Sequence, residues 1–240
     1  PPRSTLFPYT TLFRSILGGL ILSSGLFTNA ALSPNITMSD DATIYRHAGS
    51  LANPPLLSGR VSNIYYGGCI TGSELTPSVN DLVIAAGGNT VTLSSSVRVE
   101  RNLHLQDGNL SIAANTLELS GGTIYDSGII IGGETSNIVV SGAEAEFPVR
   151  LYDLNLNNLA ISRSNGFQML GDIILESTVS IGAGCIQDTD LAYYLDLANP
   201  SSELRGAGYW FGTVLQNIGN RGFISAPLGI SIGAGISISS

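Results

Sequence analysis

Carboxylates are the first residues to weigh, because clustered acids hold Ca²⁺ and facing pairs of acids cleave glycosidic bonds. Asp188 and Asp190 stand two residues apart and come nearest to a metal-binding pair. Two acids in a loop also make an ordinary solvated corner. Asp126, Asp153 and Asp172 could approach one another, but nothing selects them as a catalytic pair. We therefore expect no catalytic residue, no cofactor and no metal, with Asp188 and Asp190 as the metal candidates.

The histidines and cysteines add no recognisable site. His47 and His104 are isolated, without a Cys or His at ligand spacing, which argues against zinc. His104 lies between two leucines, so we expect it to point outward from a strand. Cys69 and Cys185 are too far apart in the repeat described below to form a disulfide, unless the N-terminal region folds back.

Aromatic side chains could stack on sugar rings. The candidates for glycan stacking are Tyr193, Tyr194 and Trp210, with Tyr65 and Tyr66 as further aromatics. Tyr193 and Tyr194 are adjacent, so in a strand one of them faces outward. The same aromatic residues could instead fill the core or lie on the surface without binding a ligand.

The elements that position these residues follow from a repeat. Apolar pairs two residues apart recur at steps of 20, 21, 21 and 20 residues. These pairs are Val97/Val99, Leu117/Leu119, Ile138/Val140, Leu159/Ile161 and Val179/Ile181. A fixed period of this size indicates stacked structural repeats, and the first members of the pairs should stack in register. A second, looser column is expected at Leu110, Ile131, Leu151, Ile173 and Leu195.

Short strands separated by Gly and Asn fill each repeat. Apolar-x-apolar triplets follow one another about every seven residues, which excludes helices and leaves three strands and three corners per turn. An antiparallel sandwich would show longer strands and no fixed period. The sequence therefore predicts an all-β fold, a right-handed, single-stranded parallel β-helix with about 20–21 residues per coil.

The chain divides into five parts. Residues 1–15 form an expected adapter artefact, because residues 5–15 resemble a translated sequencing adapter. Residues 16–30 resemble the apolar and cleavage parts of a truncated signal peptide, with cleavage after Ala30. Residues 31–79 form an irregular N-terminal cap region, and residues 80–200 form the β-solenoid. Residues 201–240 form a truncated strand or hairpin extension. We expect no membrane span in the mature chain.

Charge excludes one class of partner. The net charge is −8, and all ten basic residues are Arg. An acidic chain without a basic patch does not neutralise phosphates, so we expect no nucleic-acid partner.

A resemblance extends over residues 81–240. Asp81-Leu-Val-Ile84, Gly108-Asn-Leu-Ser-Ile112 and Asn115-Thr-Leu-Glu-Leu119 resemble the repetitive β-solenoid regions of large secreted bacterial surface proteins. These adhesin-like chains are often exported by a type IX secretion system. The resemblance implies a secreted or cell-surface location and a segment of a longer chain. It also implies a non-catalytic role as a stalk or presentation surface, with extracellular glycans or surface proteins as partners. The alternative is a carbohydrate-active β-helix that binds or cleaves polysaccharide.

Overall fold

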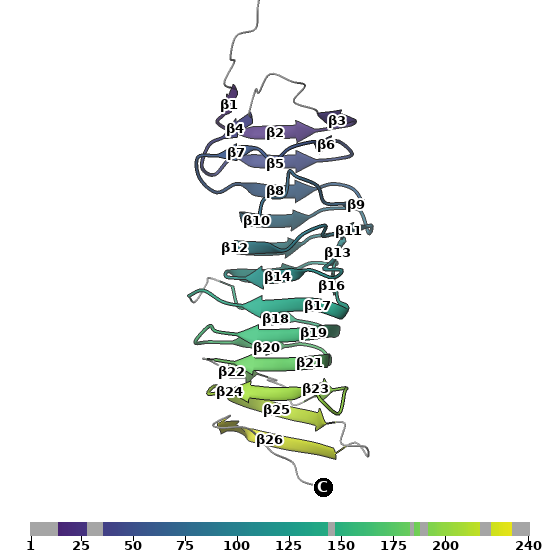
Figure 1. The fold of residues 1–240 in the computed structure, drawn as a ribbon, viewed down its shortest axis with the longest axis vertical. Helices are drawn as coiled ribbons and strands as arrows, with labels where there is room; N and C mark the ends of the chain where they lie inside the picture. Colours follow the sequence, from purple (N-terminus) through teal and green to yellow (C-terminus); the bar gives the residue numbers. More distant parts are fainter. Residues whose placement is uncertain are drawn as a thin grey trace, which may run out of the picture.

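The chain is a parallel β-solenoid. The computed structural model describes residues 14–27, 36–143, 147–182, 185–187, 192–216 and 222–231. These residues form strands and connecting turns without a helix. The strands stack as a solenoid of about eight turns. The chain advances along the long axis of the molecule, and the strands run across that axis (Figure 1). The predicted fold class is confirmed.

Each coil passes through three walls, which we number by their order along the chain. Wall 1 carries the aliphatic pairs of the repeat, and its strands pair in parallel from coil to coil. Its strands are β1 (Arg14–Ile16), β4 (Ile36–Met38), β7 (Leu56–Leu57), the starts of β10 (Ser78–Ile84) and β12 (Val97–Leu105), β14 (Thr116–Leu119), the ends of β17 (Gly133–Val140), β19 (Leu154–Ile161) and β21 (Ile173–Ile181), and β24 (Glu203–Gly206).

Walls 2 and 3 complete each coil. Wall 2 contains β2 (Gly19–Leu22), β5 (Thr43–Arg46), β8 (Ser62–Tyr65), the ends of β10 and β12, β15 (Gly122–Tyr125), β18 (Arg150–Leu151), β20 (Phe167–Met169), β22 (Cys185–Gln187) and the start of β25 (Tyr209–Gln216). Wall 3 contains β3 (Leu26–Phe27), β6 (Ser50–Leu51), β9 (Cys69–Ile70), β11 (Thr90–Thr92), β13 (Asn109–Ser111), β16 (Ile130–Ile131), the starts of β17, β19 and β21, β23 (Tyr194–Leu197) and the end of β25.

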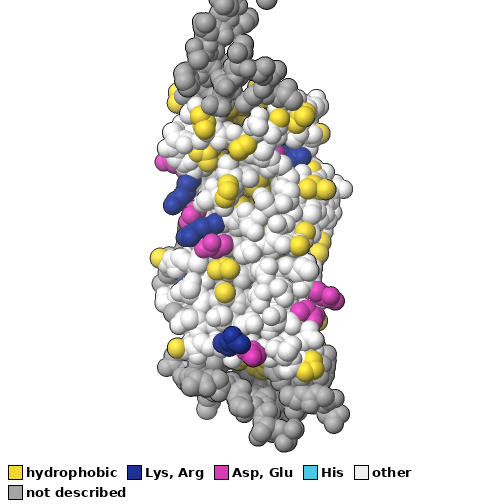
Figure 2. Space-filling view, viewed as in Figure 1, with side chains coloured by type: hydrophobic (Ala, Val, Ile, Leu, Met, Phe, Trp, Pro, Cys, Tyr) yellow, Lys and Arg dark blue, Asp and Glu magenta, His cyan; other side chains and the backbone are white. Residues whose placement is uncertain are grey.

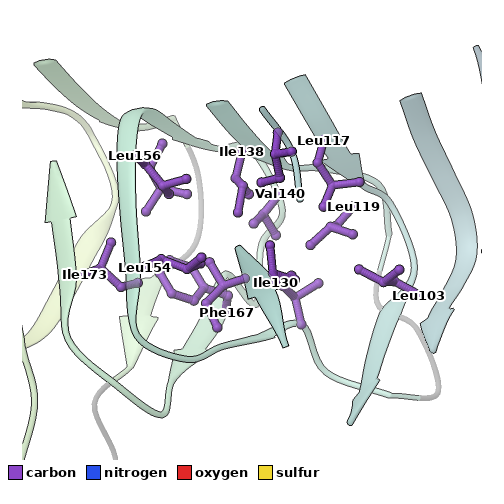
Figure 3. Packing of buried hydrophobic residues seen from close by; sticks show 14 of the residues in the cluster. Leu103, Leu117, Leu119, Ile130, Ile138, Val140, Leu154, Leu156, Phe167 and Ile173 are labelled. Atoms are coloured by element: carbon purple, nitrogen blue, oxygen red, sulfur yellow. The ribbon is translucent and has the colours of Figure 1, made fainter. Parts of the chain in front are cut away.

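The core is built from the inward side chains of these walls. Val97, Leu117, Ile138, Leu159 and Val179 are Cα partners in successive coils, as the repeat predicts. All five are buried. Leu117 and Ile138 point from wall 1 towards the interior that also holds Phe167 (Figure 3). Because these coils bury the same positions, the apolar interior is continuous from Tyr65 to Val214.

The second predicted column is partly wrong. Leu110 pairs with Ile130 rather than Ile131, and Leu151 belongs to wall 2, where it pairs with Met169. Leu154 takes the expected place of Leu151, since it pairs with Ile173. The cause is a long connection between Val140 and Arg150, which delays wall 2 in that coil and shortens the step to wall 3.

The two ends of the stack differ from the expected boundaries. Parallel pairing already begins with β1 and β4, so residues 36–79 belong to the stack rather than to a separate cap. Within the predicted signal peptide, β2 and β3 pair with β5 and β6. At the other end, β24 and β25 continue the parallel stack to Gln216. The expected hairpin forms only there, where β26 (Gly222–Ser231) pairs antiparallel with β25.

Candidate functional site

The residues predicted to bind ligands are only partly brought to the surface. Asp188 and Asp190 lie outside the described residues. Tyr194, at the start of β23, is 37% exposed, whereas Tyr193 packs against the core, so one of the two faces outward as predicted. Trp210 lies in β25 in register with Ile186, and its side chain is outside the described part of the structure.

A different group of rings lies on the outer surface of wall 2. Tyr45 is in β5, His47 follows that strand, and Tyr66 follows β8 one coil later. The Tyr66 ring centroid is 4.7 Å from that of His47 and 6.5 Å from that of Tyr45, and the planes are within 14° of parallel. We call Tyr45, His47 and Tyr66 the aromatic platform. The sequence identified Tyr66 as an aromatic candidate but gave no sign of its two partners.

A charged cluster lies inside the first coils. Glu74 is fully buried, and its Oε1 accepts hydrogen bonds from Arg46 Nη1, from Tyr65 Oη at 3.2 Å and from the Gly72 amide at 2.9 Å. Asn63 Nδ2 donates to the Glu74 carbonyl oxygen at 3.0 Å. We call these five residues the Glu74 cluster. Its ion pair joins a wall 2 strand to the turn that follows β9, and so links successive coils.

The Glu74 cluster does not prepare a nucleophile. Burial raises the pKa of the neighbouring Cys69 thiol; Arg46 opposes this shift and Glu74 adds to it. Burial and the Glu74 carboxylate also raise the pKa of Tyr65 well above its ordinary value. A thiol with a raised pKa stays protonated near neutrality and is a poor nucleophile or metal ligand. Cys69 is a free cysteine, and the Cys185 side chain is outside the described residues.

Ion pairs on the surface also run between coils. Arg98 bridges Glu118 of the next coil at 3.1 Å, and Arg101 Nη2 lies 2.6 Å from Asp81 Oδ2 of the preceding coil. Arg98 also bridges Glu100 of its own strand at 3.0 Å. Figure 2 shows a mostly uncharged face on which the basic side chains lie beside acidic ones in small groups, while one acidic group at the right edge lies apart from them. Charges paired in this way are largely compensated, so they offer no extended field for an ionic ligand.

Polar side chains also hold the corners of the coils. Asn137 Oδ1 accepts from Asn158 Nδ2 at 2.8 Å, and Asn158 Oδ1 accepts from the Thr178 amide at 3.2 Å. Arg163 is buried and donates to the carbonyl oxygens of Ser141 at 3.0 Å and Gly121 at 2.7 Å. The repeat predicted the corner asparagines, but it missed Arg163, which links three successive coils.

The described ranges contain no group of three or more His, Cys, Asp or Glu side chains arranged to hold a metal ion. In the same ranges, no helix is long and apolar enough to cross a membrane.

Comparison with known proteins returns no relative. No protein-family model, curated protein or solved structure matches the chain. The fold and its surfaces therefore carry the functional argument.

Proposed function

We propose that this chain is a non-catalytic segment of an exported bacterial surface protein of the adhesin-like kind, and that it acts as a stalk or presentation surface. The observation that carries the proposal is the uninterrupted register of wall 1 from Val97 to Leu204. Each coil adds about 4.8 Å of length and repeats the same core. Such a stack sets a distance between its two ends, which is the task of a stalk.

The first coil supports export. Burial still alternates along β2, but large apolar side chains also occupy the exposed positions of this coil. Leu17, Ile21, Leu26 and Phe27 are all about half exposed or more. A signal peptide is apolar all round because it is selected for insertion and cleavage rather than for packing. On this proposal the exported chain begins at Ala31, and N-terminal sequencing of the secreted product reads that residue first.

The stalk proposal is tested by removing one coil. Deleting residues 137–157 joins Ser136 to Asn158, which preserves the Ser-Asn dipeptide and the register, because Asn137 and Asn158 are Cα partners. We expect a folded protein with cooperative thermal unfolding, shortened along its axis by about 4.8 Å in small-angle scattering.

The matched control deletes residues 137–147, which removes about half a coil. This change takes away the inward residues of β17 and forces wall 1 out of register, so we expect loss of cooperative unfolding. If both deletions behaved alike, the coils would not be interchangeable spacers, and the stalk proposal would be rejected.

A further inference from the structure

The outward side chains of wall 2 form rows along the stack. In β5 and at the ends of β8, β10 and β12, buried residues alternate with partly exposed ones, whose side chains point out of the wall. Ser62, at the start of β8, is itself buried. The parallel register lines these residues up in a middle row that consists of Tyr45, Ile64, Val83 and His104. A polar row of Thr43, Ser62, Asp81 and Asn102 lies two residues earlier on the same face. His47 and Tyr66 lie two residues later, on the opposite side of the middle row.

This face combines ring surface with hydrogen-bonding groups. Tyr66 is 44% exposed, so a large part of its ring is open to solvent. Ser62 Oγ, Arg101 Nη2 and Asn102 Nδ2 all donate to the Asp81 carboxylate, which fixes the polar row in place. Aromatic surface beside a few fixed polar groups is the usual lining of a site for an organic ligand.

The dimensions of the face select the class of ligand. Four coils span about 14 Å along the axis, and four residues along a strand span about 13 Å, so the face covers on the order of 200 Å². A stable protein partner or a second copy needs roughly 800 Å² on each side. The outward rows continue to Ile124 in β15, but the part that carries the rings and the polar row has only this smaller area, which matches a few sugar rings.

The charge of this face restricts the class of ligand further. The Asp81 carboxylate is paired with Arg101, and the middle row contains no carboxylate and no arginine. A neutral sugar offers apolar C–H faces for the rings and hydroxyl groups for the polar row. We propose that the aromatic platform, together with the polar row, binds a neutral pyranose unit of an extracellular polysaccharide. Tyr45 and Tyr66 supply the stacking surface. All residues of the site follow Ala30 and so belong to the exported chain.

The test is affinity electrophoresis of the full chain through gels that contain one soluble polysaccharide each. The neutral probes are β-glucan, mannan and xylan, and the charged probes are polygalacturonate and alginate. We expect retardation by at least one neutral polysaccharide. Tyr66→Ala weakens this binding at least tenfold, whereas Tyr66→Phe, which keeps the ring, binds like the parent chain. The matched control is Tyr152→Ala, which removes a similarly exposed tyrosine from the turn after β18 and leaves binding unchanged.

Three outcomes overturn the proposal. The first is migration unaffected by every neutral polysaccharide, and the second is binding to the charged probes alone. The third is a loss caused by Tyr152→Ala but not by Tyr66→Ala. The site is independent of the stalk role, because the deletion of residues 137–157 leaves β5 to β12 untouched. The coil deletion therefore tests the stalk proposal, and affinity electrophoresis tests the sugar site, so that either proposal can fail while the other stands.

Discussion

The Glu74 cluster contains a buried ion pair between Arg46 and Glu74. Apolar side chains at the same positions would stabilise the fold more. Three of its buried polar atoms, Glu74 Oε2, Arg46 Nε and Asn63 Oδ1, make no hydrogen bond. Removing charges from water costs several kcal/mol per ion, and a partly satisfied network returns less than this cost. The cluster therefore fixes how the first coils stack, at the expense of stability.

Removing one partner of this pair should be costly. Glu74→Ala leaves the Arg46 guanidinium buried without its carboxylate, so we expect a loss of about 3–5 kcal/mol in the free energy of unfolding. Replacing both partners, with Arg46→Met and Glu74→Leu, should be neutral or stabilising by about 1–4 kcal/mol. Urea unfolding measures both changes.

The exposed pair of Glu203 and Arg205 provides the control. Because water screens this pair, Glu203→Ala should change the free energy of unfolding by less than about 1 kcal/mol. Equal effects of Glu74→Ala and Glu203→Ala would show that burial does not distinguish the two pairs.

Single residues also show what a sequence can and cannot tell. Alternation placed His104 outward, and it does face outward, where Nε2 lies 2.8 Å from Asp126 Oδ2. The same alternation in Thr43–Arg46 places Arg46 inward. A buried guanidinium is stable there only because the Glu74 carboxylate compensates its charge. The partner lies in an irregular turn, and no local pattern predicts such a long-range ion pair.

At the scale of the element, the corners decide where each strand begins. Gly121 follows β14 and Gly182 follows β21, so both lie at the corner after a wall 1 strand. Their surroundings differ greatly: a Cβ on Gly121 would lie 1.4 Å from the Arg101 carbonyl oxygen, whereas one on Gly182 would lie 3.6 Å from the Ile161 carbonyl oxygen. The backbone of the neighbouring coil therefore requires glycine at the first position and only tolerates it at the second.

Two alanine substitutions test this difference. Gly121→Ala should force two coils apart and reduce the free energy of unfolding by on the order of 3 kcal/mol. Gly182→Ala should be neutral, or stabilising by up to about 1 kcal/mol, because alanine restricts the unfolded chain. Thermal unfolding of the two variants compares them directly. A similar effect of both substitutions would contradict the close approach at Gly121.

At the scale of the whole molecule, the hydrophobic interior is divided. The first cluster contains Leu22, Met38, Ala42, Ile44, Leu51 and Val61, and the second extends from Tyr65 to Val214. Asn63 stacks between Ile44 of the first cluster and Leu82 of the second, and Arg46 stacks on Tyr65. A polar layer therefore interrupts the apolar contacts between the first coils and the rest.

This division predicts two stages of opening. In a linear stack, stability is a sum of coil and interface terms, so a weak interface lets one end open alone. Amide hydrogens in β4, β5 and β6 should exchange through an opening of lower free energy than those in β12, β14 and β17. Native-state hydrogen exchange measures both sets. Uniform protection along the chain would mean that the polar layer does not divide the stack.

The same division explains how much of the architecture could be predicted. The coils from Val97 to Ile181 repeat with nearly constant length and bury the same aliphatic pair, so their register follows from the sequence. The earlier coils bury polar residues and use strands as short as β7, which leaves no visible period. The aromatic platform lies in these coils. Its rings are neighbours because they lie in adjacent coils, and no period in this part of the sequence reveals where those coils begin.

The most direct test of the account is the parallel register itself. In a Cys69→Ser, Cys185→Ser background, we would introduce Val139→Cys and Ala160→Cys, which are outward Cα partners in adjacent coils. Neighbouring strands lie about 4.8 Å apart, within the range that a disulfide spans. The control pair, Val139→Cys with Ser180→Cys, is two coils apart at about 9.6 Å, beyond that range. The account predicts loss of both free thiols on mild oxidation of the first pair and none in the control. Equal cross-linking of the two pairs, or none in either, would contradict the parallel stack.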